Sequence, residues 1–281
     1  MPDQRDEHNS RKLALLIEYE GSRYSGFQIQ ANAPTIQGVM EQALDKITGE
    51  GNRLKGASRT DTGVHALGQV ATFVTATQHS ARTFVGALNS HLPEDVAVRA
   101  SAETAPCFDV RRHALTRRYR YVLLQRRTPS PLLRAGTHRV RRPLDVEAMA
   151  TAAGTLLGRH DFASFSAKLS NQTSTVREIT RVGFSENGDL LFFDIEANAF
   201  LPQQVRRTVG ELIAVGAGEQ PVERIRQLLQ CPILGAASSP VPPHGLYLME
   251  IAYAPDALRF DGGASAARSS GWAAGISLPR S

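Results

Sequence analysis

The chain contains 281 residues, of which 42% are hydrophobic and 21% are charged, so it can build one large or two smaller folded domains. No apolar stretch approaches the roughly 18 residues that span a bilayer, and the polar N-terminus does not resemble a secretory signal. Two cysteines are too few for a disulfide scaffold or a four-cysteine zinc site, and they suit a reducing compartment. We therefore expect a cytoplasmic protein without membrane association.

The positive charge is concentrated in one segment. The chain has 32 Lys and Arg against 27 Asp and Glu, a net charge of +5. Residues 111–142 contain eleven arginines and no acidic residue, so the rest of the chain is net negative. Guanidinium groups bind phosphate oxygens in pairs and stack on bases, and the interleaved Tyr119 and Tyr121 offer further stacking surfaces. The segment favours a nucleic-acid partner, although a solvated arginine-rich face would have the same composition.

Hydrophobic periodicity predicts the same order of elements twice. In the first half we expect, in turn, a strand at 12–19, a helix from Thr35 to Gly49, a strand at 69–75, a helix that begins at Ser80 and a strand at 96–102. In the second half we expect a strand at 119–124, a helix from Asp145 to Gly158, a strand at 190–197, a helix that Pro202 opens, a short helix at 222–229 and a strand at 245–253.

Strands and helices that alternate in this way predict the α+β class. We expect two lobes, ferredoxin-like or RRM-like in type, each with a mostly antiparallel sheet and helices packed on one face. The expected boundaries are an N-terminal tail at 1–11, an N-terminal lobe at 12–106, a C-terminal lobe at 107–254 that includes the arginine-rich segment 111–142, and a flexible tail at 255–281.

One loop gathers residue types that carry chemistry. Between Gly56 and Gln69, small and turn-forming residues surround Asp61, with Arg59 two residues before it and His65 four residues after it. A carboxylate beside fixed cations stays ionised and can serve as a nucleophile or a base. An aspartate that merely caps its own turn would have the same surroundings. The residues alone leave both interpretations open.

The sequence of this loop closely resembles a known motif. Residues 58–70 read Ser-Arg-Thr-Asp-Thr-Gly-Val-His-Ala-Leu-Gly-Gln-Val, which is similar to the catalytic motif of the tRNA pseudouridine synthase A family. Further segments resemble that family in the right order, at 18–28, 35–38, 108–121, 158–162, 198–207 and 245–248. The resemblance covers roughly residues 12–254. Its departures are modest, for example Thr62 where alanine is commoner.

This resemblance implies an isomerase that breaks the N-glycosidic bond of a uridine, turns the base and rejoins it through C5. It implies tRNA as the substrate, with targets at positions 38, 39 and 40 of the anticodon arm, and it implies no cofactor and no metal. A homodimer and an active-site cleft between the two lobes are implied as well.

The pair Gly216 and Gly218 does not suggest a nucleotide cofactor, because it follows a predicted helix instead of a strand.

The resemblance also implies roles for individual residues. Asp61 matches the essential carboxylate, and whether it attacks the ribose or the base stays open. Tyr119 matches a tyrosine that packs on the target uracil and whose hydroxyl is suited to proton transfer. Arg206 matches an arginine that pairs with the catalytic aspartate.

The predicted substrate-binding residues surround these three. Arg59 matches an arginine that fills the space left by the extruded nucleotide. Leu246 matches an apolar residue of the uracil pocket. The remaining candidates would contact RNA or the rim of the pocket: Arg111, Arg118, His65 and Lys168.

Two other functions compete with this one. A non-catalytic RNA-binding module would keep the arginine-rich segment but would not need Asp61, Tyr119 and Arg206 together. A related pseudouridine synthase with a different RNA target would keep all three residues and differ in the position that it modifies.

Overall fold

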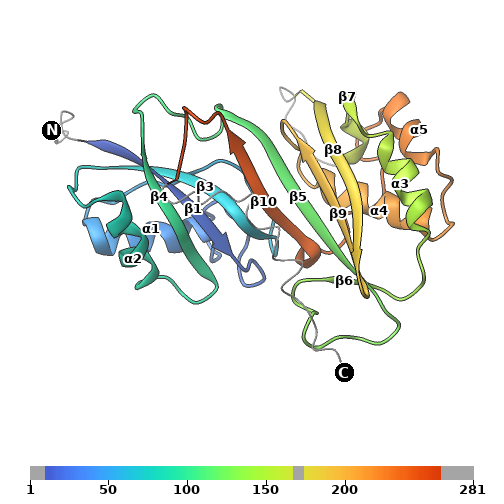
Figure 1. Ribbon diagram of the computed structural model, residues 1–281, viewed down its shortest axis with the longest axis horizontal. Coiled ribbons are helices and arrows are strands. Elements are labelled where there is room, and N and C mark those ends of the chain that lie inside the picture. The colour runs from blue at the N-terminus through green and yellow to red at the C-terminus, as the bar shows by residue number, and fades with distance from the viewer. Residues whose placement is uncertain (1–9, 167–173, 261–281) are drawn as a thin grey trace. The chain divides into compact units, whose positions relative to one another are not determined.

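The computed structural model describes residues 10–166 and 174–260, which form ten strands and five α-helices (Figure 1). The chain divides into two compact units. The first contains the described residues up to Leu115 together with those from Leu248 onward, and the second contains Thr116–Tyr247. Most neighbouring strands run antiparallel to one another. The predicted α+β class is therefore confirmed.

The first unit is built on a four-stranded path in the order β4-β1-β3-β10, with the short β2 paired to β3. The final strand β10 (Leu246–Tyr253) contributes its residues from Leu248 onward. The other elements are β1 (Arg11–Tyr19), α1 (Ile36–Thr48), β2 (Lys55–Gly56), β3 (His65–Thr75), α2 (Ala81–Asn89) and β4 (Val96–Thr104).

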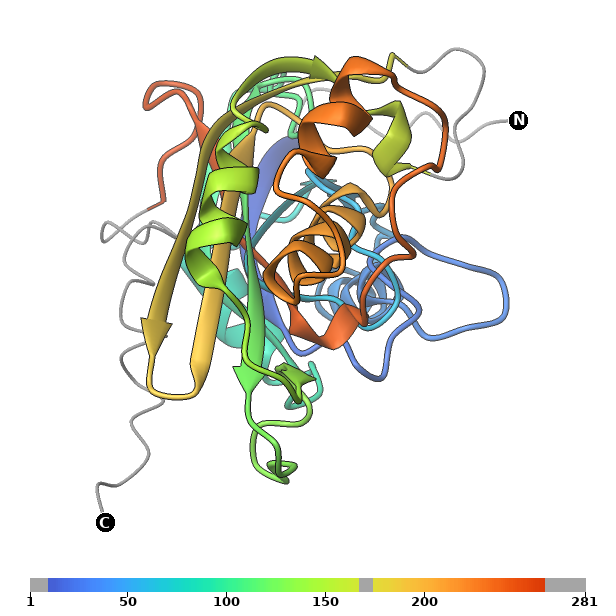
Figure 2. The same cartoon turned by 90° about the vertical axis from the view of Figure 1, so that its right-hand side faces the viewer.

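The second unit is built on the path β5-β9-β8-β7, and the short β6 pairs with β5 in parallel. Its helices gather on one side of that sheet (Figure 2). The elements are β5 (Ala114–Gln125), β6 (His138–Val140), α3 (Val146–Gly154), β7 (Gly158–Asp161), β8 (Val176–Asn187), β9 (Leu190–Ala197), α4 (Gln204–Gly216) and α5 (Arg224–Gln230).

Local capping sets the ends of several helices, as the sequence predicts. The Thr35 hydroxyl accepts a hydrogen bond from the Gly38 N–H at 3.2 Å and starts α1. Gly49 ends α1 in the left-handed region, at φ 68°. Ser80 and Asp145 accept the equivalent bonds at the starts of α2 and α3. Side-chain acceptors of this kind satisfy N–H groups that have no partner within the helix.

Aromatic rings pack against one another in pairs in each unit. In the first, Phe73 of β3 meets Phe84 of α2 edge to face, with ring centroids 5.3 Å apart. In the second, Phe193 of β9 meets Phe184 of β8 at 5.0 Å. Burying one such side chain stabilises the folded state by about 1.5–3 kcal/mol.

Two predictions about the second unit are wrong. The helix that begins at Asp145 ends at Gly154, and Gly158, which we expected to close it, starts β7. The sequence also does not predict β8, the twelve-residue strand Val176–Asn187. Only Ile179 in this strand is fully buried, so its sequence lacks the alternation of apolar and polar residues that marks a half-buried strand.

None of the helices in the two described ranges is long and apolar enough to cross a membrane.

Candidate active site

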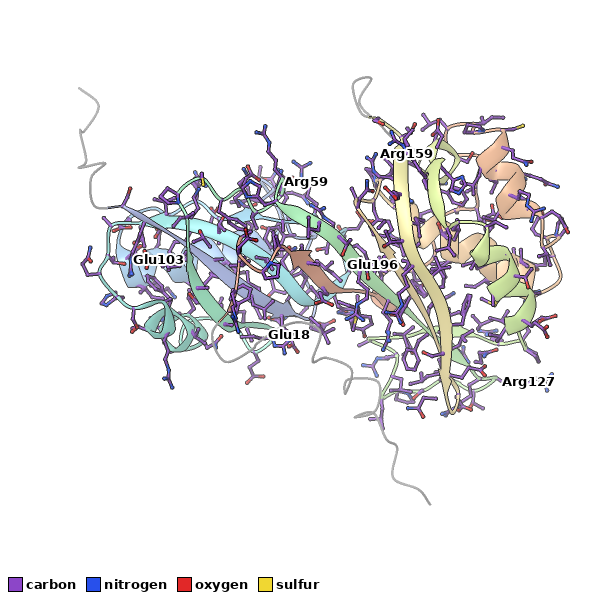
Figure 3. All side chains as sticks on the ribbon, turned by 45° about the horizontal axis from the view of Figure 1, so that its top comes forward. Glu18, Arg59, Glu103, Arg127, Arg159 and Glu196 are labelled. Atoms are coloured by element: carbon purple, nitrogen blue, oxygen red, sulfur yellow. The ribbon has the colours of Figure 1, made fainter. Side chains whose placement is uncertain are left out.

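Asp61 lies in the turn that joins β2 to β3. The Val64 N–H donates to the Asp61 carbonyl oxygen at 3.2 Å, and Gly63 supplies a left-handed residue at φ 76°. Thr60 is buried, Asp61 is half-buried and Arg59 is exposed, as Figure 3 shows for the labelled Arg59. Asp61 is therefore partly accessible to solvent, while the buried Thr60 next to it fixes the turn to the interior of the unit.

The chain that follows β1 holds this turn through several hydrogen bonds. The Tyr19 and Thr60 hydroxyl groups lie 2.8 Å apart and are hydrogen-bonded in a buried position. The Phe27 N–H donates to the Thr60 carbonyl oxygen at 3.1 Å, and the Gly63 N–H donates to the Tyr24 carbonyl oxygen at 3.3 Å. Three backbone and side-chain atoms around Asp61 are thus held by residues 33 to 41 positions earlier in the sequence.

Two glycines permit this close approach. A Cβ atom on Gly21 would lie 2.0 Å from the Val64 carbonyl oxygen, and one on Gly26 would lie 2.5 Å from the Thr60 carbonyl oxygen. Gly26 also has φ +85°, where other residues are strained. The segment after β1 can contact the Asp61 turn only because these two residues lack side chains.

His65 supports the turn from inside the unit. Its ring is 3% exposed, and Nδ1 accepts a hydrogen bond from the Gly21 N–H at 3.0 Å. Nδ1 also lies 3.2 Å from a carboxylate oxygen of Glu20. The predicted contact of His65 with the substrate stays a prediction.

Arg111 lies beside Arg59 in the first unit. Its Nε donates to the Gly56 carbonyl oxygen at 2.8 Å, next to the start of the Asp61 loop. Partial burial and the positive charge of Arg59 lower the pKa of Arg111 from its ordinary value. Lys55 lies on β2 before the same loop, but Asp109 pairs with it at 2.6 Å, so Arg59 and Arg111 supply the positive charge of this region. The surroundings of the turn are therefore suited to phosphate groups.

Tyr24, which contacts the turn through its backbone, is held by Asp95. The Tyr24 hydroxyl donates to Asp95 Oδ1 at 2.6 Å, and Arg23 Nε lies 3.0 Å from Asp95 Oδ2. Burial and the hydrogen bond with Asp95 raise the pKa of Tyr24 to about 12.

We expect Tyr24→Phe to lower the free energy of unfolding at neutral pH by about 1.5–3 kcal/mol, the contribution of a hydrogen bond to a charged group. Because the folded-state pKa is raised, this advantage of the wild type is complete below the ordinary tyrosine value of 10.0 and is lost as the pH approaches about 12. Denaturant unfolding of both proteins over this pH range measures it. A difference that stays constant up to pH 12 would contradict the assignment.

In the second unit, β5 carries Tyr119 and Tyr121 on one face. Tyr119 is 6% exposed, and its ring meets Phe200 edge to face with centroids 5.2 Å apart. Residues two apart on a strand share a face, so Tyr121 lies on the same side. The charge of Arg206 acts on Tyr121, which places the start of α4 near this face as well.

Arg206 is half-buried in the first turn of α4, where its Nε donates to the Val241 carbonyl oxygen at 2.7 Å. Leu246, 5% exposed, begins β10 shortly after Val241. The second unit thus collects Tyr119, Arg206 and Leu246, while the first collects Asp61, Arg59, Arg111 and His65.

The side chains of Arg118 and Tyr119 project from opposite faces of β5. Successive residues of a strand project to opposite faces, so Arg118 lies on the other face of the sheet. There it is in register with Glu196 of β9, labelled in Figure 3, which is itself in register with Arg181 of β8. A contact between Arg118 and RNA would have to be made on that face.

Part of the arginine-rich segment serves the fold. Arg120 forms two hydrogen bonds with the Asp194 carboxylate, at 2.9 and 2.7 Å, and its guanidinium lies 4.9 Å from the centroid of the Phe192 ring. Arg142 pairs with Glu219. Arg127, labelled in Figure 3, is exposed. The net charge of this segment therefore overstates the positive charge that it offers to a partner.

Some predictions concern residues outside the described ranges. Lys168 is one of them, and most of the expected tails at 1–11 and 255–281 are also outside. Within the described ranges, no three His, Cys, Asp or Glu side chains gather as ligands of a metal ion would. Cys107 and Cys231 are exposed free thiols.

Comparison with known proteins identifies the family. The chain matches the family profile described as tRNA pseudouridine synthase over residues 15–111 and 152–254. The chain belongs to this family. Asp61 lies in the first matched range and Arg206 in the second, whereas most of the arginine-rich segment falls between them.

Curated relatives agree with this assignment. The chain is 41% identical to the tRNA pseudouridine synthase A of Thermoanaerobacter sp. (strain X514) over 243 residues, which is 86% of this chain and 100% of the relative. It is 43% identical to the tRNA pseudouridine synthase A of Myxococcus xanthus over 243 residues, 86% of this chain and 92% of that protein. The family resemblance seen in the motifs is therefore confirmed.

A distant likeness exists to a chain in the crystal structure of a Cbf5-Nop10-Gar1 complex, at 10% identity and a TM-score of 0.31, covering 71% of this chain and 54% of that one.

Proposed function

We propose that this chain is an isomerase that converts uridine to pseudouridine in tRNA, at positions 38, 39 and 40 of the anticodon arm, with Asp61 as the essential carboxylate. The observation that carries the proposal is the Asp61 turn. It combines a half-buried carboxylate, a close glycine-lined support and neighbouring arginines within the first range of the family match. Relatives with about 40% identity are named tRNA pseudouridine synthase A.

The chemistry requires one carboxylate and a pocket for a detached base. The bond between uracil N1 and ribose C1′ breaks, the base turns, and a bond forms between C5 and C1′. The C5 proton then leaves to solvent and N1 takes up a proton from solvent, so the product is an isomer of the substrate. Asp61 would attack the ribose or the base, or assist loss of a ribose proton. In this proposal Tyr119 stacks on the uracil, Leu246 lines its pocket and Arg206 pairs with Asp61.

Binding of the RNA would rest on arginines of both units. Arg59 would fill the space of the extruded nucleotide, whose removal from the stack costs a few kcal/mol. Arg111, Arg118 and exposed residues such as Arg127 would hold phosphates, with Arg111 and Arg118 nearest the site, and His65 and Lys168 would contact the RNA or the rim of the pocket. Because such contacts release condensed counterions, tRNA binding is expected to weaken as salt concentration rises.

The assembly would be a homodimer in the cytoplasm, with each tRNA spanning both subunits. Light scattering of the purified protein, alone and with tRNA, tests this part. A mass of one chain at micromolar concentration in both samples would contradict it.

Release of tritium from an unmodified tRNA transcript labelled at uracil C5 tests the activity, because pseudouridine formation removes that hydrogen. We expect release, and mapping of the product should place pseudouridine at positions 38 to 40. Release with pseudouridine elsewhere would favour a related synthase with another target. No release from several tRNAs that bind in a gel shift would favour a non-catalytic RNA-binding module.

A further inference from the structure

Residues 237–242 of the second unit, which we call the α4 strap, lie along α4 and are held there by polar side chains of that helix. Glu211 Oε1 accepts a hydrogen bond from the Ser238 N–H at 2.7 Å. Arg207 Nη1 donates to the carbonyl oxygens of Ala237 at 3.1 Å and Ser238 at 3.2 Å. Glu211 and Arg207 are 1% and 8% exposed, so water competes little for these bonds.

The strap also holds Arg206, the residue that would pair with Asp61. Arg206 Nε donates to the Val241 carbonyl oxygen at 2.7 Å, and the Val241 N–H donates to the Arg206 carbonyl oxygen at 3.3 Å. Nε lies in the plane of the guanidinium, so its hydrogen bond fixes the direction of that plane. The position of Val241 therefore decides where Arg206 points.

The Tyr121 side chain, which projects from β5, holds Pro242, the next residue of the α4 strap. Its hydroxyl donates to the Pro242 carbonyl oxygen at 2.7 Å, and its side chain is 0% exposed. A Cβ atom on Gly245 would lie 2.8 Å from Tyr121 Cζ, so the ring has no room to shift toward that residue. Burial raises the pKa of the Tyr121 hydroxyl far above its ordinary value, so the group remains a donor at any pH near neutral.

We propose that Tyr121 is a positioning residue for pseudouridine formation: it holds the backbone of Val241 and Pro242, and that backbone orients the guanidinium of Arg206. This inference rests on the proposed function, because it gives Tyr121 a task in that reaction. Tyr121 needs no contact with RNA for this task, since its hydroxyl is engaged with Pro242.

Tyr121→Phe removes the hydroxyl and keeps the ring. We expect kcat for C5 tritium release to fall about 10- to 100-fold, because a small misplacement of a catalytic group costs that much. The KM for tRNA should change by less than about twofold, since the phosphate contacts are made by other residues.

Tyr253→Phe is the matched control. The Tyr253 hydroxyl donates to the Val110 carbonyl oxygen at 2.7 Å in the first unit, so this variant loses the same kind of bond. We expect both variants to lose a similar amount of thermal stability, and only Tyr121→Phe to lose kcat. An equal fall of kcat in the two variants would overturn the proposal.

A double-mutant cycle with Arg206→Lys separates an effect through Arg206 from general loosening of the unit. If Tyr121 acts through Arg206, then Tyr121→Phe lowers kcat little further once lysine replaces Arg206. Multiplicative effects in the double variant, or wild-type kcat in Tyr121→Phe alone, would contradict the proposal. If Tyr121→Phe does not fold, Gly245→Ala displaces the ring instead and should lower kcat in the same range; wild-type kcat in that variant would also contradict it.

The proposed function itself fails by different results, namely no tritium release by the wild type or full release by Asp61→Asn. Release that requires Asp61 and is indifferent to Tyr121 would overturn only the positioning role.

Discussion

Asp61→Asn is expected to abolish C5 tritium release, lowering the rate by about 10⁴-fold or more, while tRNA binding is retained. The amide has nearly the shape of the carboxylate but is neither a nucleophile nor a base. The turn itself should persist in the variant, because Thr60, Gly63 and Val64 hold it through their own hydrogen bonds. A single-turnover assay and a gel shift on the same tRNA measure the two properties.

Asp45→Asn is the matched control for this experiment. Asp45 is an exposed carboxylate on α1 of the same unit, and its substitution changes the net charge by the same amount. We expect it to release tritium at the wild-type rate. Asp61→Ala guards against slow reversion of asparagine to aspartate and should be equally inactive. Full release by either Asp61 variant would exclude Asp61 as the essential carboxylate.

Gly21→Ala is expected to destabilise the first unit by about 3 kcal/mol, toward the upper end of the cost of overpacking. The added Cβ would lie 2.0 Å from the Val64 carbonyl oxygen, so either the segment after β1 or the Asp61 turn must shift. We also expect the variant to release tritium well below the wild-type rate at a lower temperature, at which both proteins are folded. Thermal unfolding and the release assay measure these effects.

Gly86→Ala provides the contrasting case. Gly86 lies inside α2, and a Cβ atom there would meet nothing within 4 Å. Alanine favours a helix interior by about 1 kcal/mol over glycine, so this variant should unfold at a higher temperature and keep its activity. If both variants unfold at the wild-type temperature, the contact between Gly21 and the Asp61 turn is not as close as the structure has it.

The sequence by itself determined the features that depend on nearby residues. Thr35, Gly49 and Ser80 act on helix ends within a few positions, and their effects are visible in the structure. The Asp61 turn was recognisable because its motif is contiguous, and the family followed from motifs in order along the chain. Runs of apolar residues predicted the strands that are buried, such as β9, which begins with four consecutive buried apolar residues.

Only the tertiary structure decided the features that depend on distant residues. Strand β8 lacks an apolar pattern because it is mostly exposed, and it is held by pairing with β7 and β9. Arg120 belongs to the arginine-rich segment that favoured an RNA partner, but in the structure its guanidinium is paired with the Asp194 carboxylate. The close approach of Gly21 to Val64 and the hydrogen bond from Tyr121 to Pro242 join residues 43 and 121 positions apart. Hydrogen bonds and close approaches over such separations leave no periodic trace in the sequence, since they are set by the packing of whole elements.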